Sequence, residues 1–82
     1  MNEYIATFHT HLSALRTSRA LTQAGISARM APVPRKLSSS CGTCVRYKAE
    51  TPRLEAMDED VESVYLLAEG ERYTQVYGNQ KE

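Results

Sequence analysis

The chain has 82 residues and a formal net charge of zero, with 41% hydrophobic residues and a single Phe. This length predicts one domain, residues 1–82, whose small core gives only marginal stability. No apolar run is long enough to cross a membrane and no signal-peptide pattern is present, so we expect a cytoplasmic protein without a membrane partner.

The zero net charge hides an asymmetry along the sequence. Residues 1–48 carry seven Lys or Arg against one acid, Glu3, whereas residues 49–82 carry three bases against nine acids. Either the two halves neutralise each other in the fold, or the basic half faces an anion or an acidic partner. The bases are scattered and are not interleaved with stacking aromatic residues, so nucleic acid is not expected as a partner.

The first half of the chain predicts two strands separated by a helix. Residues 4–8 alternate large and small side chains rich in strand formers. Residues 10–24 change to helical spacing, with Thr10 as the N-cap and a glycine just beyond the C-terminus. Residues 26–33 alternate again and lead into two prolines, which cannot donate to a strand ladder.

The second half predicts a loop, a third strand, a short helix and a hairpin. These elements are expected over residues 35–43, 44–48, 52–57 and 63–77, with the turn of the hairpin near Gly70. The acidic run at residues 58–60 is expected to be a solvated turn, and residues 78–82 a frayed tail.

This order of elements predicts an α+β fold, the ferredoxin-like split βαβ sandwich (βαββαβ) with a C-terminal hairpin extension. In that fold the first two strands run parallel, so their carboxyl ends lie at the same edge of the sheet as the start of the first helix. The loop after the second strand is therefore expected to meet the segment "FHTH", although about thirty residues separate them.

The loop contains the only two cysteines, Cys41 and Cys44, in a C-x-x-C arrangement with Gly42 behind the first. This spacing lets both sulfurs approach one atom or each other. In a reducing compartment such a pair is more typical of a reactive thiol or a metal ligand than of a structural disulfide.

Positive charge and hydrogen-bond donors near the loop favour a thiolate. Arg35 and Lys36 are the first two residues of the loop, and the free N–H groups at the start of the predicted helix also favour an anion. Ser40, like the two serines before it, could donate to a thiolate or a bound oxyanion, or simply keep the loop polar.

A zinc site is the alternative interpretation. His9 and His11 lie at the strand–helix junction, and with Cys41 and Cys44 they supply two nitrogens and two sulfurs, the ligand set of a tetrahedral zinc site. Zinc would then add the stability that a small core lacks, in an interaction module without catalytic activity. Either histidine could instead bond locally at the helix start or exchange protons with the thiols.

Two segments, "YIATFHTHLSAL" and "MAPVPRKLSSSCGTCVRY", closely resemble the small bacterial selenium/sulfur carrier protein-like family, over residues 3–48. The resemblance implies delivery of reduced sulfur or selenium, by a carrier rather than a stand-alone enzyme. Cys41 and Gly42 match the family's cysteine–glycine, and Cys44 falls where many members lack a cysteine. Pro32, Pro34 and Arg35 match the approach to the loop.

The residues and the resemblance together predict a carrier mechanism. Cys41 would hold the chalcogen as a persulfide or selenopersulfide, and Cys44 would be the resolving thiol that expels it and forms a disulfide. A sulfur or selenium donor protein and an acceptor protein would be the partners, and an exposed sheet edge could pair two copies into a homodimer.

Overall fold

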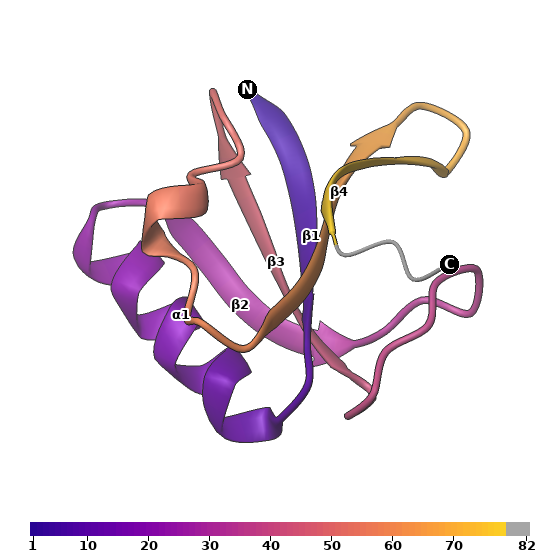
Figure 1. The fold of residues 1–82 in the computed structure, drawn as a ribbon. Coiled ribbons are helices and arrows are strands. Elements are labelled where there is room, and N and C mark those ends of the chain that lie inside the picture. Colours follow the sequence, from indigo (N-terminus) through magenta and orange to yellow (C-terminus); the bar gives the residue numbers. More distant parts are fainter. Residues whose placement is uncertain (79–82) are drawn as a thin grey trace.

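The computed structural model describes residues 1–78 and shows one helix against a curved sheet (Figure 1). Along the chain the elements are β1 (Asn2–Phe8), α1 (His11–Gln23), β2 (Ser27–Pro32), β3 (Thr43–Ala49), the 3-10 turn η1 (Leu54–Ala56), β4 (Val61–Ala68) and β5 (Arg72–Gly78). The expected tail falls, for residues 79–82, outside the described residues. None of the helices in residues 1–78 combines the length and apolar character that a membrane crossing needs.

The sheet has the strand order β2-β3-β1-β4-β5, and each neighbouring pair is antiparallel. The α+β class is therefore confirmed. β1 and β2 run in the same direction because each is antiparallel to β3, which lies between them. The expected hairpin is present as β4 and β5, joined across Gly70 and Glu71, both with positive φ.

The ferredoxin-like βαββαβ sandwich is not confirmed. Its second helix is reduced to η1, and the sheet has a fifth strand, so the order differs from that of a four-stranded sandwich. The physical reason lies at both ends of the short segment. Arg53 has a left-handed φ of 55° and provides no side-chain cap, and Met57 is already extended, which leaves too few residues to offset the cost of helix nucleation.

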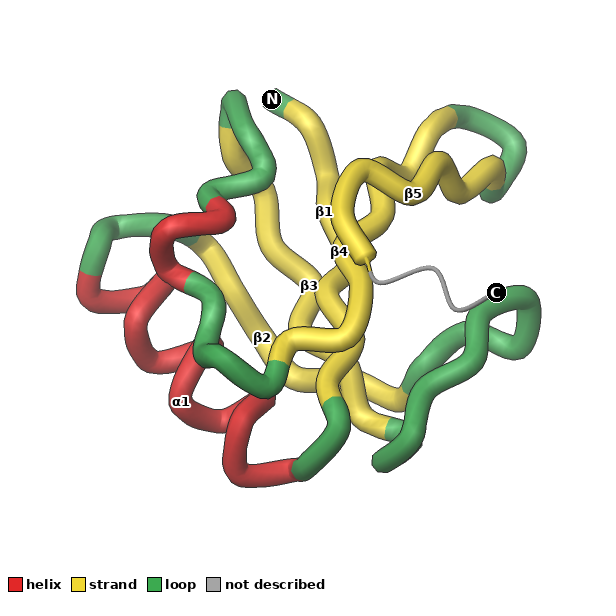
Figure 2. Tube along the Cα trace, viewed as in Figure 1, coloured by secondary structure: helices red, strands yellow, loops and turns green. Residues whose placement is uncertain are grey.

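The core lies between α1 and one face of the sheet, on the left of the sheet in Figure 2. The side chains of β1 alternate between the two faces, and both faces are buried. Phe8 packs on the helix side, where Tyr4 and Tyr47 stack with ring centroids 5.4 Å apart. On the other side Ile5 and Thr7 are also fully buried, so β1 is the central strand of a fold with two covered faces.

The helix begins as predicted, with Thr10 as its N-cap. The Thr10 hydroxyl accepts a hydrogen bond from the backbone N–H of Ser13 at 3.1 Å, which satisfies one of the free donors of the first turn. Gly25 follows the C-cap with a φ of +83°, a conformation that favours glycine. Only two residues separate the end of β1 from the start of α1, at the edge where the cysteine loop also lies.

Asp58 ties the acidic segment to the helix, which corrects the expectation of a solvated turn at this position. Its Oδ2 accepts from the Ser13 hydroxyl at 2.8 Å, and its backbone N–H donates to the Thr17 hydroxyl at 2.9 Å. Arg16 lies 3.8 Å from Oδ1. Since Ser13 and Thr17 are almost fully buried, Asp58 supplies partners that water does not.

Replacing Asp58 by Ala is expected to lower the free energy of unfolding by about 1–3 kcal/mol, because the buried Ser13 hydroxyl loses its acceptor. Urea unfolding of the variant measures this. Glu59→Ala is the matched control, since Glu59 is exposed and its replacement should stay within about 0.5 kcal/mol. Equal effects of the two substitutions would show that the contacts of Asp58 are unimportant.

Candidate functional site

The cysteine loop joins β2 to β3 and lies at the carboxyl end of β1. In the sheet register Cys44 is opposite Thr7 on one side and Ala31 on the other. The loop is closed by a backbone hydrogen bond of 3.1 Å from Val33 to the carbonyl of Gly42, and Gly42 has a φ of +75°. A left-handed glycine directly after Cys41 turns the chain back into β3.

The prediction that this loop meets the segment "FHTH" is confirmed. The Ser39 hydroxyl donates to the backbone carbonyl of Phe8 at 3.0 Å. Next to it, Nδ1 of His9 lies 3.3 Å from the Ser40 hydroxyl. The loop is therefore held against the β1–α1 junction by two serines, one through a backbone oxygen and one through a side chain.

Glu62, near the start of β4, holds the same loop together with His9. Its Oε1 accepts from the backbone N–H of Ser40 at 3.1 Å and its Oε2 from the Ser40 hydroxyl at 2.9 Å. Nδ1 of His9 is 3.7 Å from Oε2, close enough for an ion pair when the imidazole is protonated. The sequence reasoning missed Glu62. The charge asymmetry suggests that an acid of the second half pairs with the first half, but nothing local identifies which acid.

Cys41 is partly exposed near the end of this clamped loop, two residues before the start of β3. Its backbone N–H donates to the Ser39 hydroxyl at 3.4 Å, and its thiol donates to the carbonyl of Thr43 at 3.6 Å. The same Ser39 hydroxyl that bonds Phe8 thus also supports the backbone of Cys41. Cys41 is accessible to a reactant while its backbone N–H is held by Ser39.

Arg35 and Lys36 form no hydrogen bond or ion pair through their side chains within residues 1–78. The backbone around them forms a turn, with Leu37 donating to the carbonyl of Pro34 at 3.0 Å. Their expected role in stabilising a thiolate therefore stays a prediction. The hydroxyl of Ser40, another residue of that expected set, is engaged by Glu62 and not by sulfur.

Cys44 lies in the core, near the start of β3, and not on the surface of the loop. It has no exposed area, and its thiol donates to the carbonyl of Pro32 at 3.5 Å. Burial raises the pKa of this thiol, and the nearby positive charges of Arg46 and Arg29 oppose the rise only in part. Attack by Cys44 on a chalcogen held by Cys41 needs a deprotonated and accessible sulfur, so its role as the resolving thiol stays a prediction.

The four side chains of the zinc alternative are not assembled into one site. Within the described part of the chain, no group of three or more His, Cys, Asp or Glu is arranged to hold a metal ion. His9 is engaged by Ser40 and Glu62, and Cys44 points to the carbonyl of Pro32. His11 is exposed in the first turn of α1.

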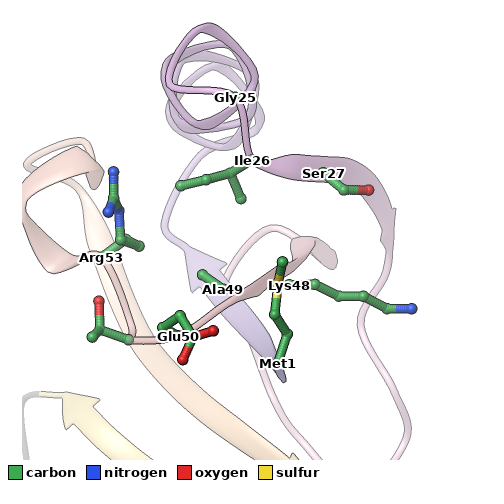
Figure 3. A pocket seen from close by; sticks show the side chains of 9 residues that line it. Met1, Gly25, Ile26, Ser27, Lys48, Ala49, Glu50 and Arg53 are labelled. Carbon is green, nitrogen blue, oxygen red and sulfur yellow. The ribbon is translucent and has the colours of Figure 1, made fainter.

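A pocket of about 390 Å³ lies away from the cysteine loop, at the opposite end of β3. Figure 3 shows Ile26, Ala49 and Met1 around it, while the side chain of Lys48 extends away from them. Because β3 begins beside the cysteine loop and ends beside this pocket, the pocket does not contribute to the chemistry of Cys41.

Comparison with known proteins places this arrangement in a family. The family described as "Putative Se/S carrier protein-like" matches residues 3–65. The chain belongs to this Se/S carrier protein-like family. The match covers the region from β1 into β4, so the cysteine loop and its clamp, Glu62, both lie within it. The resemblance recognised in residues 3–48 is thus confirmed and extended.

A relative of this Se/S carrier-like chain is a protein of Escherichia coli (strain K12) that carries the name "Uncharacterized protein YtiA". The two are 36% identical over 45 residues, which is 55% of this chain and 53% of the relative. The chain therefore aligns with about half the length of the relative. No solved structure matches the chain.

Proposed function

We propose that the protein carries sulfur or selenium as a persulfide or selenopersulfide on Cys41. The observation that carries this proposal is the contrast between the two thiols within a family described as Se/S carrier-like: Cys41 is accessible on a clamped loop, and Cys44 is buried. A carrier needs one thiol that a donor and an acceptor can both reach. The clamp by Ser39, Ser40 and Glu62 keeps that thiol at the surface.

Loading is a thiol exchange without net oxidation. The Cys41 thiolate attacks the outer sulfur of a donor persulfide, R–S–SH, so that the donor's S–S bond breaks and a new one forms in Cys41–S–SH. The donor leaves as a thiolate and takes up a proton from solvent. Arg35 and Lys36, two and one residues before Leu37 at the start of the loop, supply positive charge that favours the attacking thiolate.

Unloading follows one of two routes, and the burial of Cys44 favours the first. An acceptor protein's thiolate attacks the outer sulfur of Cys41–S–SH, and Cys41 leaves as the thiolate. In the second route the Cys44 thiolate attacks Sγ of Cys41, expels hydrosulfide and leaves a Cys41–Cys44 disulfide, which an external thiol must reduce. The second route requires the loop to open, because Cys44 has no exposed area.

Incubating the reduced protein with a small-molecule persulfide donor tests the proposal. Intact mass spectrometry should show a gain of one sulfur atom that a reductant removes and that maps to Cys41. Cys41→Ser should lose this adduct completely, and Cys44→Ser, the matched control, should keep it. An adduct that persists in Cys41→Ser, or that maps to Cys44 in the wild type, contradicts the proposal.

A further inference from the structure

A row of cations lies on the face of the sheet opposite α1, at its β2–β3 end. In the antiparallel register Arg29 of β2 stands directly opposite Arg46 of β3, and Ser27 stands opposite Lys48. Residues directly opposite each other in an antiparallel pair, and residues two apart along one strand, share a face. Arg29, Arg46 and Lys48 therefore project from the same face, away from the core residues Val45 and Tyr47.

One carboxylate offsets only part of this charge. Oε2 of Glu3 lies 3.4 Å from Nε of Arg46, yet that buried Nε makes no hydrogen bond within residues 1–78. Neither Arg29 nor Lys48 forms an ion pair in the same part of the chain. These side chains line a hollow of about 280 Å³, together with Ser27 and Tyr47. Three cations against one acid leave this hollow with two uncompensated positive charges.

This pairing is unfavourable unless something negative lies between the cations. Like charges directly opposite each other on a sheet destabilise it, and a buried guanidinium donor without an acceptor adds to the cost. A guanidinium group is planar, and its N–H donors match the spacing of the oxygens of phosphate-like anions. Two guanidinium groups that line one hollow therefore suit an anion with two negative charges.

We propose that this face binds a small tetrahedral oxyanion with two negative charges, a phosphate or sulfate group, between Arg29 and Arg46. The site goes beyond the carrier function and does not depend on the chemistry of Cys41. The group is either the free ion or the end of a small molecule. A nucleic-acid backbone fits less well, because the cations are confined to one small hollow.

Thermal unfolding of the full chain in inorganic phosphate tests the site. The ionic strength is held constant with sodium chloride, since general screening alone would change the stability of a charged surface. A ligand that binds the folded state raises Tm with its concentration. We expect phosphate and sulfate to raise Tm saturably and acetate to do so far less, and equal shifts from acetate or chloride would overturn the proposal.

Arg29→Gln separates this site from a general salt effect. Without phosphate the variant should have a Tm about 2–5 °C above the wild type, because a like-charged pair is removed. Added phosphate should leave the Tm of the variant constant. At saturating phosphate the wild type should therefore have the higher Tm of the two proteins. Arg19→Gln is the matched control, because Arg19 is exposed on α1 and should leave the phosphate response unchanged. A phosphate response of wild-type size in Arg29→Gln overturns the proposal.

Amide spectra of the whole chain locate the ion and identify its source. Titrated phosphate should shift the resonances of Ser27, Arg29, Arg46 and Lys48, and those of the cysteine loop should stay in place. Shifts confined to other residues would contradict the site. A simple organic phosphomonoester is compared with inorganic phosphate at about pH 7.5, where the ester carries close to two negative charges. Tighter binding of the ester identifies the ligand as a phosphorylated molecule, and equal binding identifies it as the free ion. Persulfide loading of Cys41 is measured separately, so either proposal can fail alone.

Discussion

Iodoacetamide should alkylate Cys41 in the native protein at least about 100-fold faster than Cys44, because Cys44 reacts only after the protein opens locally. Only the thiolate reacts, so two properties slow Cys44. It has no exposed area, and burial raises the pKa of its thiol. Cys41 is partly exposed in the loop and reacts without any opening.

Each rate is measured on a variant with a single thiol, Cys44→Ser for Cys41 and Cys41→Ser for Cys44. The same variants unfolded in urea provide the control, since the two thiols should then react at similar rates. Similar rates in the native protein would show that the loop opens readily. In that case Cys44 would be available as a resolving thiol, and release of hydrosulfide would compete with delivery to an acceptor.

The juxtaposition that builds the site follows from the sequence by a topological argument. Once residues 4–8, the helix and residues 26–33 are recognised as one βαβ unit, their parallel strands must end at the same edge of the sheet. The contacts of Ser39 with Phe8 and of Ser40 with His9 then need no long-range information beyond the strand direction. The family match, over residues 3–65, includes this segment.

The burial of Cys44 does not follow from its own strand. Alternation in residues 44–48 correctly places Val45 and Tyr47 in the core, and so puts Cys44 on the other face. Whether that other face is covered depends on β1, whose Ile5 and Thr7 are buried opposite the helix. Coverage of both faces is a property of the assembled fold, so the spacing of the C-x-x-C pair alone does not show that one of the two thiols is buried.

Glu62 escaped prediction, and the short helix expected over residues 52–57 is reduced to η1, for the same kind of reason. Glu62 is an ordinary acid in a strand until the loop, more than twenty residues earlier in the sequence, donates two hydrogen bonds to it. The segment before β4 has residues that tolerate a helix, but Asp58 is drawn to the hydroxyls of α1 and the chain extends instead. In both places a tertiary contact decides the local structure.

The protein should lose stability in alkaline solution, because two buried groups hold their protons in the fold. Burial raises the pKa of Cys44, and burial together with the negative charges of ionised Tyr4 and Glu55 raises the pKa of Tyr47 far above its usual value. The Tyr47 hydroxyl also donates to the carbonyl of Pro52, a bond that the ionised form cannot make. In the unfolded chain the cysteine thiol loses its proton at about pH 8.5 and the tyrosine hydroxyl at about pH 10.

Stability falls with rising pH because the unfolded chain loses protons more easily than the folded protein. Below about pH 8 both states are protonated, and the stability of the fold is fully present. As the pH rises the unfolded chain loses its protons first and is favoured, by about 1.4 kcal/mol per pH unit for each group. We therefore expect the free energy of unfolding to fall between about pH 8 and 11, with Tyr47 alone removing about 1.4 kcal/mol per pH unit above about pH 10, which matters for the stability of a small domain.

Urea unfolding at a series of pH values measures this slope, and two variants divide it. Cys44→Ala should remove the fall in the free energy of unfolding that begins at about pH 8.5. Tyr47→Phe should remove the fall above about pH 10. Tyr77→Phe is the matched control for the second, because Tyr77 is 39% exposed and should leave the slope unchanged. A wild-type slope in Cys44→Ala would mean that this thiol ionises as easily in the fold as in the unfolded chain. It would then be free to act as a nucleophile beside Cys41.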